Sequence, residues 1–222
     1  MKKINLIVYS TNDEFISIPI LFEVFNKLPN NINVDLFLDN PNFFRKLKIL
    51  LVFILFSPLK DFRFIYKKKN LEYFNELKNV KLINKPSKKY NYGFLINYTK
   101  KIKLKNYDIF NFHLGNFINQ RGSFGYFFKF KYKWSKMDLT FHKIDKNWDK
   151  GQIIKKKTIN VKDLSAIQIC FLYKKNINFI HKCMLAVISC NQKYLIPRYG
   201  KLNTTPSYFE IFCIYFRNLL KI

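Results

Sequence analysis

Three residues of this chain carry side chains suited to acyl-transfer chemistry: Asn111, His113 and Asp149. Asn111 and His113 lie in the second half of segment 108–113, which suits a buried strand, and Asp149 follows the histidine by 36 residues, just before Gly151. A carbonyl under nucleophilic attack develops negative charge on its oxygen, which an amide N–H and an imidazole cation stabilise. A carboxylate beside the imidazole keeps it protonated and oriented, and helps to collect the proton that an attacking amine loses. These are the parts needed to move an acyl group onto an amine.

The elements that would position these residues alternate between short apolar strands and helices. We expect strands over residues 4–9, 34–38, 80–83, 93–97, 109–112, 139–144 and 153–159. We expect helices over residues 18–28, 43–56, 71–77, 124–130 and 208–220, and a long helical pattern from 163 to 189 with Ser165 as its cap. Residues 62–66 suit either a strand or a loop.

This alternation is typical of an α/β protein with a Rossmann-like, open, mostly parallel sheet flanked by helices. Ligands of such sheets collect at the carboxyl ends of the strands, where Asn111 and His113 would lie. We expect one catalytic domain over residues 1–190 and a short C-terminal extension with a terminal helix over residues 191–222. The sequence has no Gly-x-Gly-x-x-Gly motif and no Walker loop, so it gives no support for ordinary nucleotide-cofactor binding.

The charge of the chain is strongly positive, with Lys+Arg 40 against Asp+Glu 14 and a formal net charge of +26. A field of this sign attracts nucleic acid, anionic lipid or phosphorylated substrates. Lysine greatly outnumbers arginine, and Asn, Ile, Phe and Tyr abound, which is also what an A/T-rich genome encodes without selection on charge. Both interpretations stay open, so the charge alone identifies no partner.

The cysteines, the N-terminus and one apolar run narrow the class of protein. The four cysteines form no CxxC pair and suit reduced core thiols, with Cys183 and Cys190 on one helical face; no metal site is expected.

The apolar run near the N-terminus is too short for a signal peptide, which favours the cytoplasm. Residues 49–56 are too few to span a membrane, for which about 20 are needed. We expect a buried helix there, with an interfacial anchor flanked by lysines as the alternative.

The residues around the candidate triad resemble the signatures of the folate-dependent formyltransferases. The segment 111–122, Asn-Phe-His-Leu-Gly-Asn-Phe-Ile-Asn-Gln-Arg-Gly, is similar to the family pattern of Asn-x-His, a loop that usually carries Ser-Leu-Leu-Pro, and Arg-Gly. Segment 139–145 resembles the threonine-bearing strand of the family, and segment 149–154 resembles its Asp-x-Gly-x-Ile turn. The opening loop 10–15 is similar to that of the methionyl-tRNA and amino-sugar branches. The clear match covers about residues 106–160, and Gly-Asn-Phe-Ile replaces Ser-Leu-Leu-Pro at 115–118.

The resemblance implies a role for each matched residue. Asn111 would bind the formyl oxygen, His113 would stabilise the oxyanion and transfer a proton, and Asp149 would pair with His113 and position a water. The implied formyl donor is 10-formyltetrahydrofolate, and its implied contacts are Asn97, Tyr98, Ile102 and Asp145. Arg121 would contact the substrate or, as Arg-Gly mainly does in the family, support the loop.

The implied activity is an N-formyltransferase, a one-carbon transferase acting on a primary amine. Methionyl-tRNA formyltransferases normally carry a further β-barrel domain for which this chain is short, so we favour a nucleotide-linked amino sugar as acceptor. The basic composition keeps tRNA open, and deformylase chemistry uses similar residues. The rival hypothesis is a catalytically decayed family member that binds nucleic acid or a membrane surface. The oligomeric state cannot be predicted from the sequence.

Overall fold

The protein is built around one seven-stranded sheet. The structure, a computed structural model, describes residues 3–13, 16–64, 71–86, 89–98, 100, 102, 106–145, 151–190 and 193–220. The strands of this sheet are β1 (Ile4–Thr11), β2 (Ile32–Asp39), β3 (Val80–Ile83), β4 (Tyr92–Ile96), β5 (Asp108–Leu114), β7 (Lys136–Lys143) and β8 (Ile153–Asn160). Their order is β3-β2-β1-β4-β5-β7-β8. The first five of these run parallel and the last two pair antiparallel, which confirms the predicted Rossmann-like, mostly parallel sheet.

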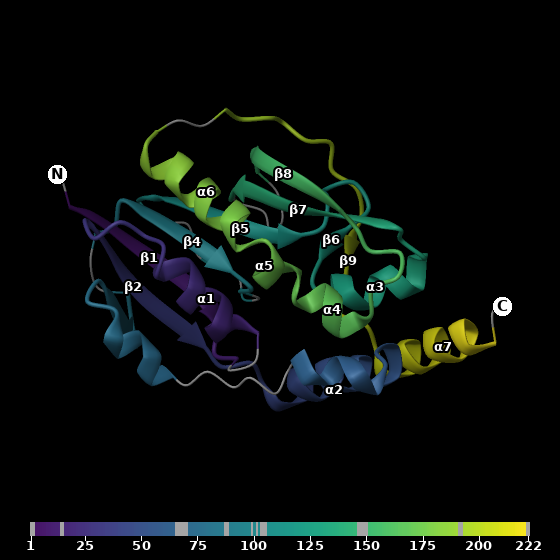
Figure 1. Ribbon diagram of the computed structural model, residues 1–222. Helices are drawn as coiled ribbons and strands as arrows, with labels where there is room; N and C mark the ends of the chain where they lie inside the picture. Colours follow the sequence, from purple (N-terminus) through teal and green to yellow (C-terminus); the bar gives the residue numbers. More distant parts are fainter. Residues whose placement is uncertain are drawn as a thin grey trace.

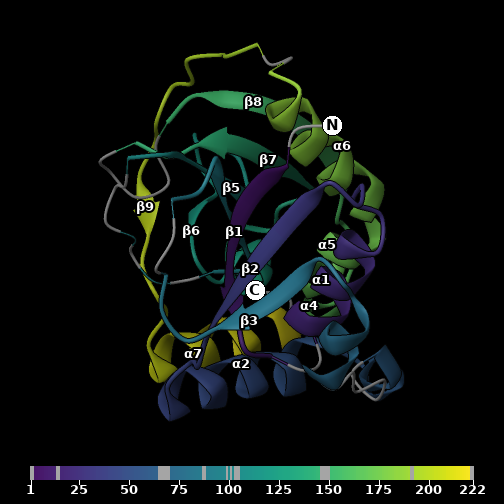
Figure 2. The same cartoon turned by 90° about the vertical axis from the view of Figure 1, so that its left-hand side faces the viewer.

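Helices cover one face and one rim of the sheet. They are α1 (Ser17–Phe25), α2 (Phe43–Phe56), α3 (Gly125–Tyr132), α4 (Ala166–Cys170), α5 (Leu172–Lys175), α6 (Ile177–Ile188) and α7 (Tyr208–Leu219), with 3₁₀ turns at Leu59–Phe64 and Leu71–Glu76. Figures 1 and 2 show α1 and α4 to α6 over one face of the sheet. The same views place α2 and α7 along the rim at the carboxyl ends of the parallel strands.

Central strands such as β1 and β4 are largely apolar because both of their faces are covered. In β1, Leu6 and Val8 belong to the large core on one side of the sheet, and Ile7 and Tyr9 belong to a smaller core on the other side. On the large-core side, aromatic rings stack across neighbouring strands. The ring centroids lie 5.7 Å apart for Phe94 and Phe110, 5.7 Å for Phe110 and Phe141, and 4.4 Å for Phe112 and Phe141. This stack fixes the register of β5, the strand that carries Asn111 and His113.

The long helical pattern from 163 to 189 is divided into three short helices. Ser165 is the N-cap as predicted: its Oγ accepts the Gln168 N–H, and the Gln168 side chain accepts the Ser165 N–H in a capping box. The division falls at Phe171 and Asn176, and Asn176 has a non-helical φ of −121°. Its Nδ2 donates to the Leu172 carbonyl at 2.7 Å. A side chain that competes for backbone partners in this way favours a turn over a continuous helix.

The prediction of a buried helix at residues 49–56 is correct for one face of α2 and wrong for the other. Val52, Phe53 and Phe56 are buried against the core. The opposite side of the helix exposes large apolar residues, among them Leu50 and Ile54 at 48% and 56%. No helix in the described ranges is both apolar and long enough to span a bilayer.

The cysteines differ from the expected set of core thiols. All four are free, but Cys190 and Cys213 are exposed. Cys183 is buried in α6, whereas Cys190 follows the end of that helix with φ +54°, so the two do not share a helical face. Among the described residues, no group of His, Cys, Asp and Glu is arranged to hold a metal ion.

A second, two-stranded sheet was not predicted. It pairs β6 (Arg121–Gly122) with β9 (Leu202–Asn203) in parallel, which joins the segment after residue 190 to the loop that follows β5. Two-residue strands carry no sequence periodicity, so their pairing depends on tertiary contacts. The division at residue 190 stays a prediction.

Candidate active site

A pocket of about 670 Å³ lies at the carboxyl ends of β1, β2, β4 and β5. It is closed on one side by α2 and on another by the start of α3. In the strand order, the chain places β2 and β3 on one side of β1 and then crosses over to β4 on its other side, so the strand order reverses at β1. The crevice at such a reversal is the usual ligand site of an open α/β sheet. The volume is also in the range typical of small-molecule sites.

Asn111 and His113 reach this pocket from the end of β5. Successive side chains of a strand alternate between its faces, so residues two apart share one face. Phe110 and Phe112 lie on the other face, inside the large core. Within the described part of the chain, the Asn111 side chain makes no hydrogen bond. Its amide is therefore available to a ligand in the pocket.

The His113 ring is held by the loop that follows β5. Its Nε2 lies 2.9 Å from the Gln120 carbonyl oxygen, and the residue is buried. A carbonyl oxygen accepts hydrogen bonds and donates none, so Nε2 carries the proton in this contact. The hydrogen bond therefore fixes both the ring orientation and the protonation of Nε2.

Gln120 is itself fixed by its side chain. Its Nε2 donates to the Lys136 carbonyl at 2.7 Å, and its Oε1 accepts from the Asn116 N–H at 3.1 Å and the Asp138 N–H at 3.4 Å. These bonds tie the loop to the antiparallel strand β7. The partner that orients His113 is thus a backbone carbonyl held by a buried amide, a role that the sequence pattern did not reveal.

Gly115 permits the contact between His113 and Gln120. It has φ +149°, and a Cβ built at this position would lie 2.1 Å from the Gln120 carbonyl oxygen and 2.9 Å from His113 Nε2. The Gly115 N–H donates to the Asp138 carbonyl at 2.6 Å, and its carbonyl accepts from Thr140 Oγ1 at 2.7 Å. The departure from the Ser-Leu-Leu-Pro loop therefore places glycine at a position where a Cβ would collide with the Gln120 carbonyl oxygen.

The structure places some of the other predicted ligand contacts in the pocket and others away from it. Asn97 and Tyr98 line the pocket at the end of β4. Ile102 packs against the smaller core, and Asp145 is exposed after β7; neither belongs to the described lining of the pocket. Asp149 lies outside the described residues.

Arg121 contacts the C-terminal segment. It is buried, its Nη1 donates to the Gly200 carbonyl, and its guanidinium lies 5.8 Å from the centroid of the Tyr199 ring. Arg121 does not belong to the described lining of the pocket, although the next residue, Gly122, does. This placement favours the loop-support role of Arg121.

Charged residues missed by the sequence analysis also line the pocket. Arg45 and Lys46 extend from α2, and Asp13 comes from the loop after β1. The Arg45 guanidinium carbon lies 5.1 Å from the centroid of the Phe124 ring, and burial lowers the pKa of this arginine. The signal for these residues was weak, because cations on α2 resemble the many other lysines of the chain. Cations at a pocket wall attract anionic ligand groups.

Comparison with solved structures shows which proteins share this fold. The chain matches a 4-N formyltransferase from Francisella tularensis with 17% identity and a TM-score of 0.58, over 96% of this chain and 86% of that chain. It matches WlaRD, a sugar 3N-formyl transferase solved in the presence of dTDP and 5-N-formyl-THF, with 18% identity and a TM-score of 0.61, over 95% and 77%. It also matches an N-formyltransferase from Helicobacter canadensis in complex with folinic acid and dTDP-3-aminofucose, with 17% identity and a TM-score of 0.60, over 95% and 78%.

Sequence comparison adds nothing to this result, because no protein-family model matches the chain and no curated protein matches it by sequence. The structural comparison confirms the resemblance at the level of the fold: the chain has the N-formyltransferase fold. Its pocket lies at the strand ends and contains Asn111 and His113 of the Asn-x-His motif.

Proposed function

We propose that this protein is an N-formyltransferase that moves the formyl group of 10-formyltetrahydrofolate to the primary amine of an amino sugar. The observation that carries the proposal is the placement of Asn111 and His113 side by side in a pocket at the strand ends, within a fold shared with N-formyltransferases. Fold alone does not define activity, so the residues of the pocket have to support the chemistry.

The pocket suits a formyltetrahydrofolate donor. Its walls combine apolar side chains such as Phe43, Leu47 and Leu50 with polar groups at the strand ends. Two of the similar structures contain a formylated tetrahydrofolate, named as 5-N-formyl-THF or folinic acid. When bound, such a donor supplies an electrophilic formyl carbon. Asn97 and Tyr98 are the lining residues that we propose for its contacts.

The side chains would act on the formyl group in complementary ways. The free amide of Asn111 would donate to the formyl oxygen, where negative charge develops as the amine attacks. The His113 ring, oriented through Nε2 by the Gln120 carbonyl, would stabilise the oxyanion and take part in proton transfer, as the resemblance implies. We propose Asp149 as the carboxylate that helps to remove the proton of the amine, as the resemblance implies.

For the acceptor we propose a nucleotide-linked amino sugar. The similar structures include one with dTDP and one with dTDP-3-aminofucose. In this chain, Arg45 and Lys46 line the same pocket as Asn111 and would face the diphosphate of such a substrate. The four free thiols fit the reducing cytoplasm in which we expect the protein to act.

A formyl-transfer assay with 10-formyltetrahydrofolate and a panel of dTDP-linked amino sugars tests the proposal. We expect His113→Ala to lower kcat/KM by at least about 100-fold. His181→Ala is the matched control, because His181 also bonds a backbone carbonyl, that of Lys27 at 2.7 Å, but lies on α6 outside the described lining of the pocket. Thermal unfolding of both variants separates lost chemistry from lost folding.

The outcomes distinguish the proposed enzyme from its rivals. Wild-type protein that transfers no formyl group to any amine of the panel would support the catalytically decayed alternative. Formate release without an amine would indicate deformylase chemistry. An equal loss of kcat/KM in the two histidine variants would show that His113 has no specific role in the reaction. Asp149→Asn should also lower kcat, and an unchanged kcat would exclude the proposed role of that carboxylate.

A further inference from the structure

Exposed apolar residues of α2 and α7 form an apolar layer that borders the pocket. Its exposed members, here called the α2/α7 face, are Phe43, Phe44, Leu47, Leu50, Ile54, Phe209, Phe212, Phe216, Leu219 and Leu220. Phe43 and Phe209 are 71% and 79% exposed. Single exposed apolar residues are ordinary, but a contiguous patch marks a site of interaction with another molecule or a membrane.

The two helices lie side by side and run in the same direction. The Tyr208 hydroxyl donates to the Phe44 carbonyl at the start of both helices, at 3.3 Å. Further along, the Phe56 and Tyr215 rings pack with centroids 6.0 Å apart. Figures 1 and 2 place both helices along the same rim of the molecule.

The exposed residues of the two helices form one surface. On α2 they recur at 43, 47, 50 and 54, and on α7 at 209, 212, 216 and 219, the spacing of a single helical stripe. In each helix the buried residues lie on the opposite side, at 52, 53 and 56 in α2 and at 211 and 214 in α7. The two helices share a lateral contact, and each directs its stripe away from the residues that it buries in the core.

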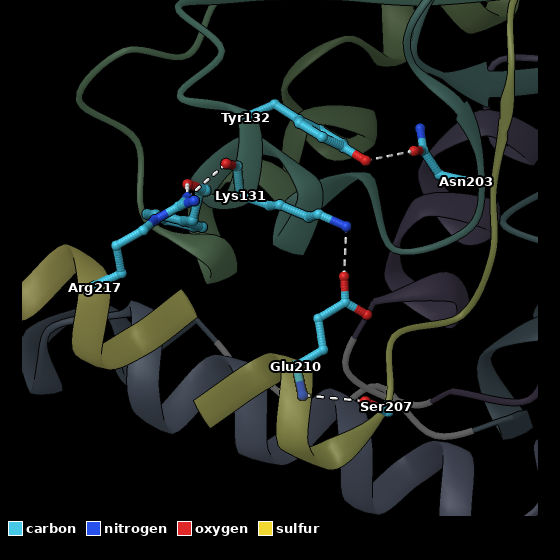
Figure 3. Close-up of polar contacts among 7 residues, drawn as sticks. Lys131, Tyr132, Asn203, Ser207, Glu210 and Arg217 are labelled. Atoms are coloured by element: carbon cyan, nitrogen blue, oxygen red, sulfur yellow. Dashed lines mark hydrogen bonds and ion pairs between the residues drawn. The ribbon is translucent and has the colours of Figure 1, made fainter. Parts of the chain in front are cut away.

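Polar contacts with α3 hold α7 in this position. Lys131 Nζ lies 2.6 Å from a Glu210 carboxylate oxygen, and Arg217 donates to the Lys131 carbonyl at 2.6 Å (Figure 3). Ser207 caps the helix by accepting the Glu210 N–H at 3.0 Å (Figure 3). The polar side of α7 is therefore occupied by α3, which leaves the apolar side outward.

The charges near the face are almost all positive. Segment 43–64 contains five cations and one carboxylate, Asp61, which is buried and accepts from Ser165. Segment 201–220 contains two cations and one carboxylate, Glu210, which is paired with Lys131. Among the cations, Lys46, Lys60, Arg63 and Lys201 are exposed.

We propose that the α2/α7 face docks on an anionic membrane surface, without spanning it. Exposed aromatic and aliphatic residues next to lysines are the features of proteins that lie in the interface of a bilayer with acidic lipids. A second copy of the chain fits the charge less well, because two molecules of formal charge +26 repel each other. Phe43, Leu47 and Leu50 belong both to the face and to the pocket wall, so docking would place the pocket next to the lipid surface.

Flotation of the full-length protein with vesicles, without formyl donor or acceptor, tests this docking independently of the proposed enzyme activity. We expect co-flotation with phosphatidylcholine vesicles that contain phosphatidylserine, and much weaker flotation with phosphatidylcholine alone. The variant Phe209→Ser/Phe216→Ser should lower the partition coefficient by on the order of tenfold for each ring. Ile196→Ser is the matched control, because Ile196 is 84% exposed and follows Leu195, which bridges to Ile153 on the edge strand β8, so its loss should leave flotation unchanged.

Three results would overturn the docking proposal. The first is no flotation of the wild type with the phosphatidylserine vesicles at low salt. The second is equal flotation of the wild type and the double variant, which would assign binding to net charge alone. The third is a dimer in light scattering that the double variant dissociates, which would assign the face to a second copy. All three substituted residues are exposed, and unchanged circular dichroism would verify folding.

Discussion

Substitution of Gly115 by alanine tests whether the loop after β5 holds His113 in a functional position. The new Cβ would meet the Gln120 carbonyl oxygen at 2.1 Å, so that carbonyl has to move by about 1 Å to restore an ordinary contact. The movement breaks the 2.9 Å contact between His113 Nε2 and the Gln120 oxygen. Alanine at φ +149° adds backbone strain of about 1–3 kcal/mol. With a lost hydrogen bond of about 1 kcal/mol, the expected destabilisation is about 2–4 kcal/mol.

A loss of this size leaves a domain of ordinary stability folded, so activity can be measured. We expect Gly115→Ala to lower formyl-transfer kcat by about 100-fold, because the ring loses its orienting partner. Urea unfolding of wild type and variant gives the stability difference, and the assay described above gives kcat.

Gly93→Ala provides the matched control for destabilisation. A Cβ at Gly93 meets side chains, Tyr107 at 3.1 Å and Ile109 at 3.3 Å, at a position outside the described lining of the pocket. Overpacking of this kind costs about 1–3 kcal/mol, but it should leave kcat unchanged. Wild-type kcat in Gly115→Ala, or an equal fall in kcat in both variants, would refute the inferred role of the loop.

Three further predictions concern stability and reactivity. Ser165→Ala should lower the free energy of unfolding by about 1–3 kcal/mol, because it removes the cap of α4 and one of the two hydrogen bonds described for the buried Asp61 carboxylate, which keeps the one from Gln168. Urea unfolding measures this, with Ser189→Ala on the exposed end of α6 as control. A thiol reagent should modify Cys190 and Cys213 quickly in the folded protein and the other two cysteines after unfolding, since burial raises the pKa of those thiols; four fast thiols would contradict this.

The third prediction concerns alkaline pH. Burial and the hydrogen bond to the Tyr107 hydroxyl raise the pKa of Tyr9 above its unfolded value of about 10. Stability from this group is therefore complete below about pH 10 and is lost as the pH rises further; urea unfolding across this range should show a fall that is smaller in Tyr9→Phe.

The sequence was sufficient to predict most elements of the sheet and the position of Asn111 and His113 at the end of one of its strands. Strands such as β1 and β5 were visible because a strand buried on both faces is a continuous apolar run. The position of His113 followed from the end of such a run, and the Ser165 cap followed from local chemistry alone. Each of these features depends on residues close together in the chain.

Features that depend on distant contacts were missed or wrongly predicted. The apolar residues of α2 were expected to be buried, but those on one side of the helix are exposed. A helix buries only the side that packs against a neighbour, and that side cannot be predicted when apolar residues occur all around the helix. The pattern from 163 to 189 gave no sign that it would be divided at Asn176.

The sequence by itself determined the order of strands and helices, the class of sheet and the pair Asn111 and His113, because local periodicity and spacing specify them. Only the tertiary structure decided that the Gln120 carbonyl orients the histidine, that Gly115 permits this approach, and that α2 and α7 together leave an apolar surface outward. The physical reason is that close approach of backbone and side chain, and the direction a helix faces, are set by the packing of segments far apart in the chain.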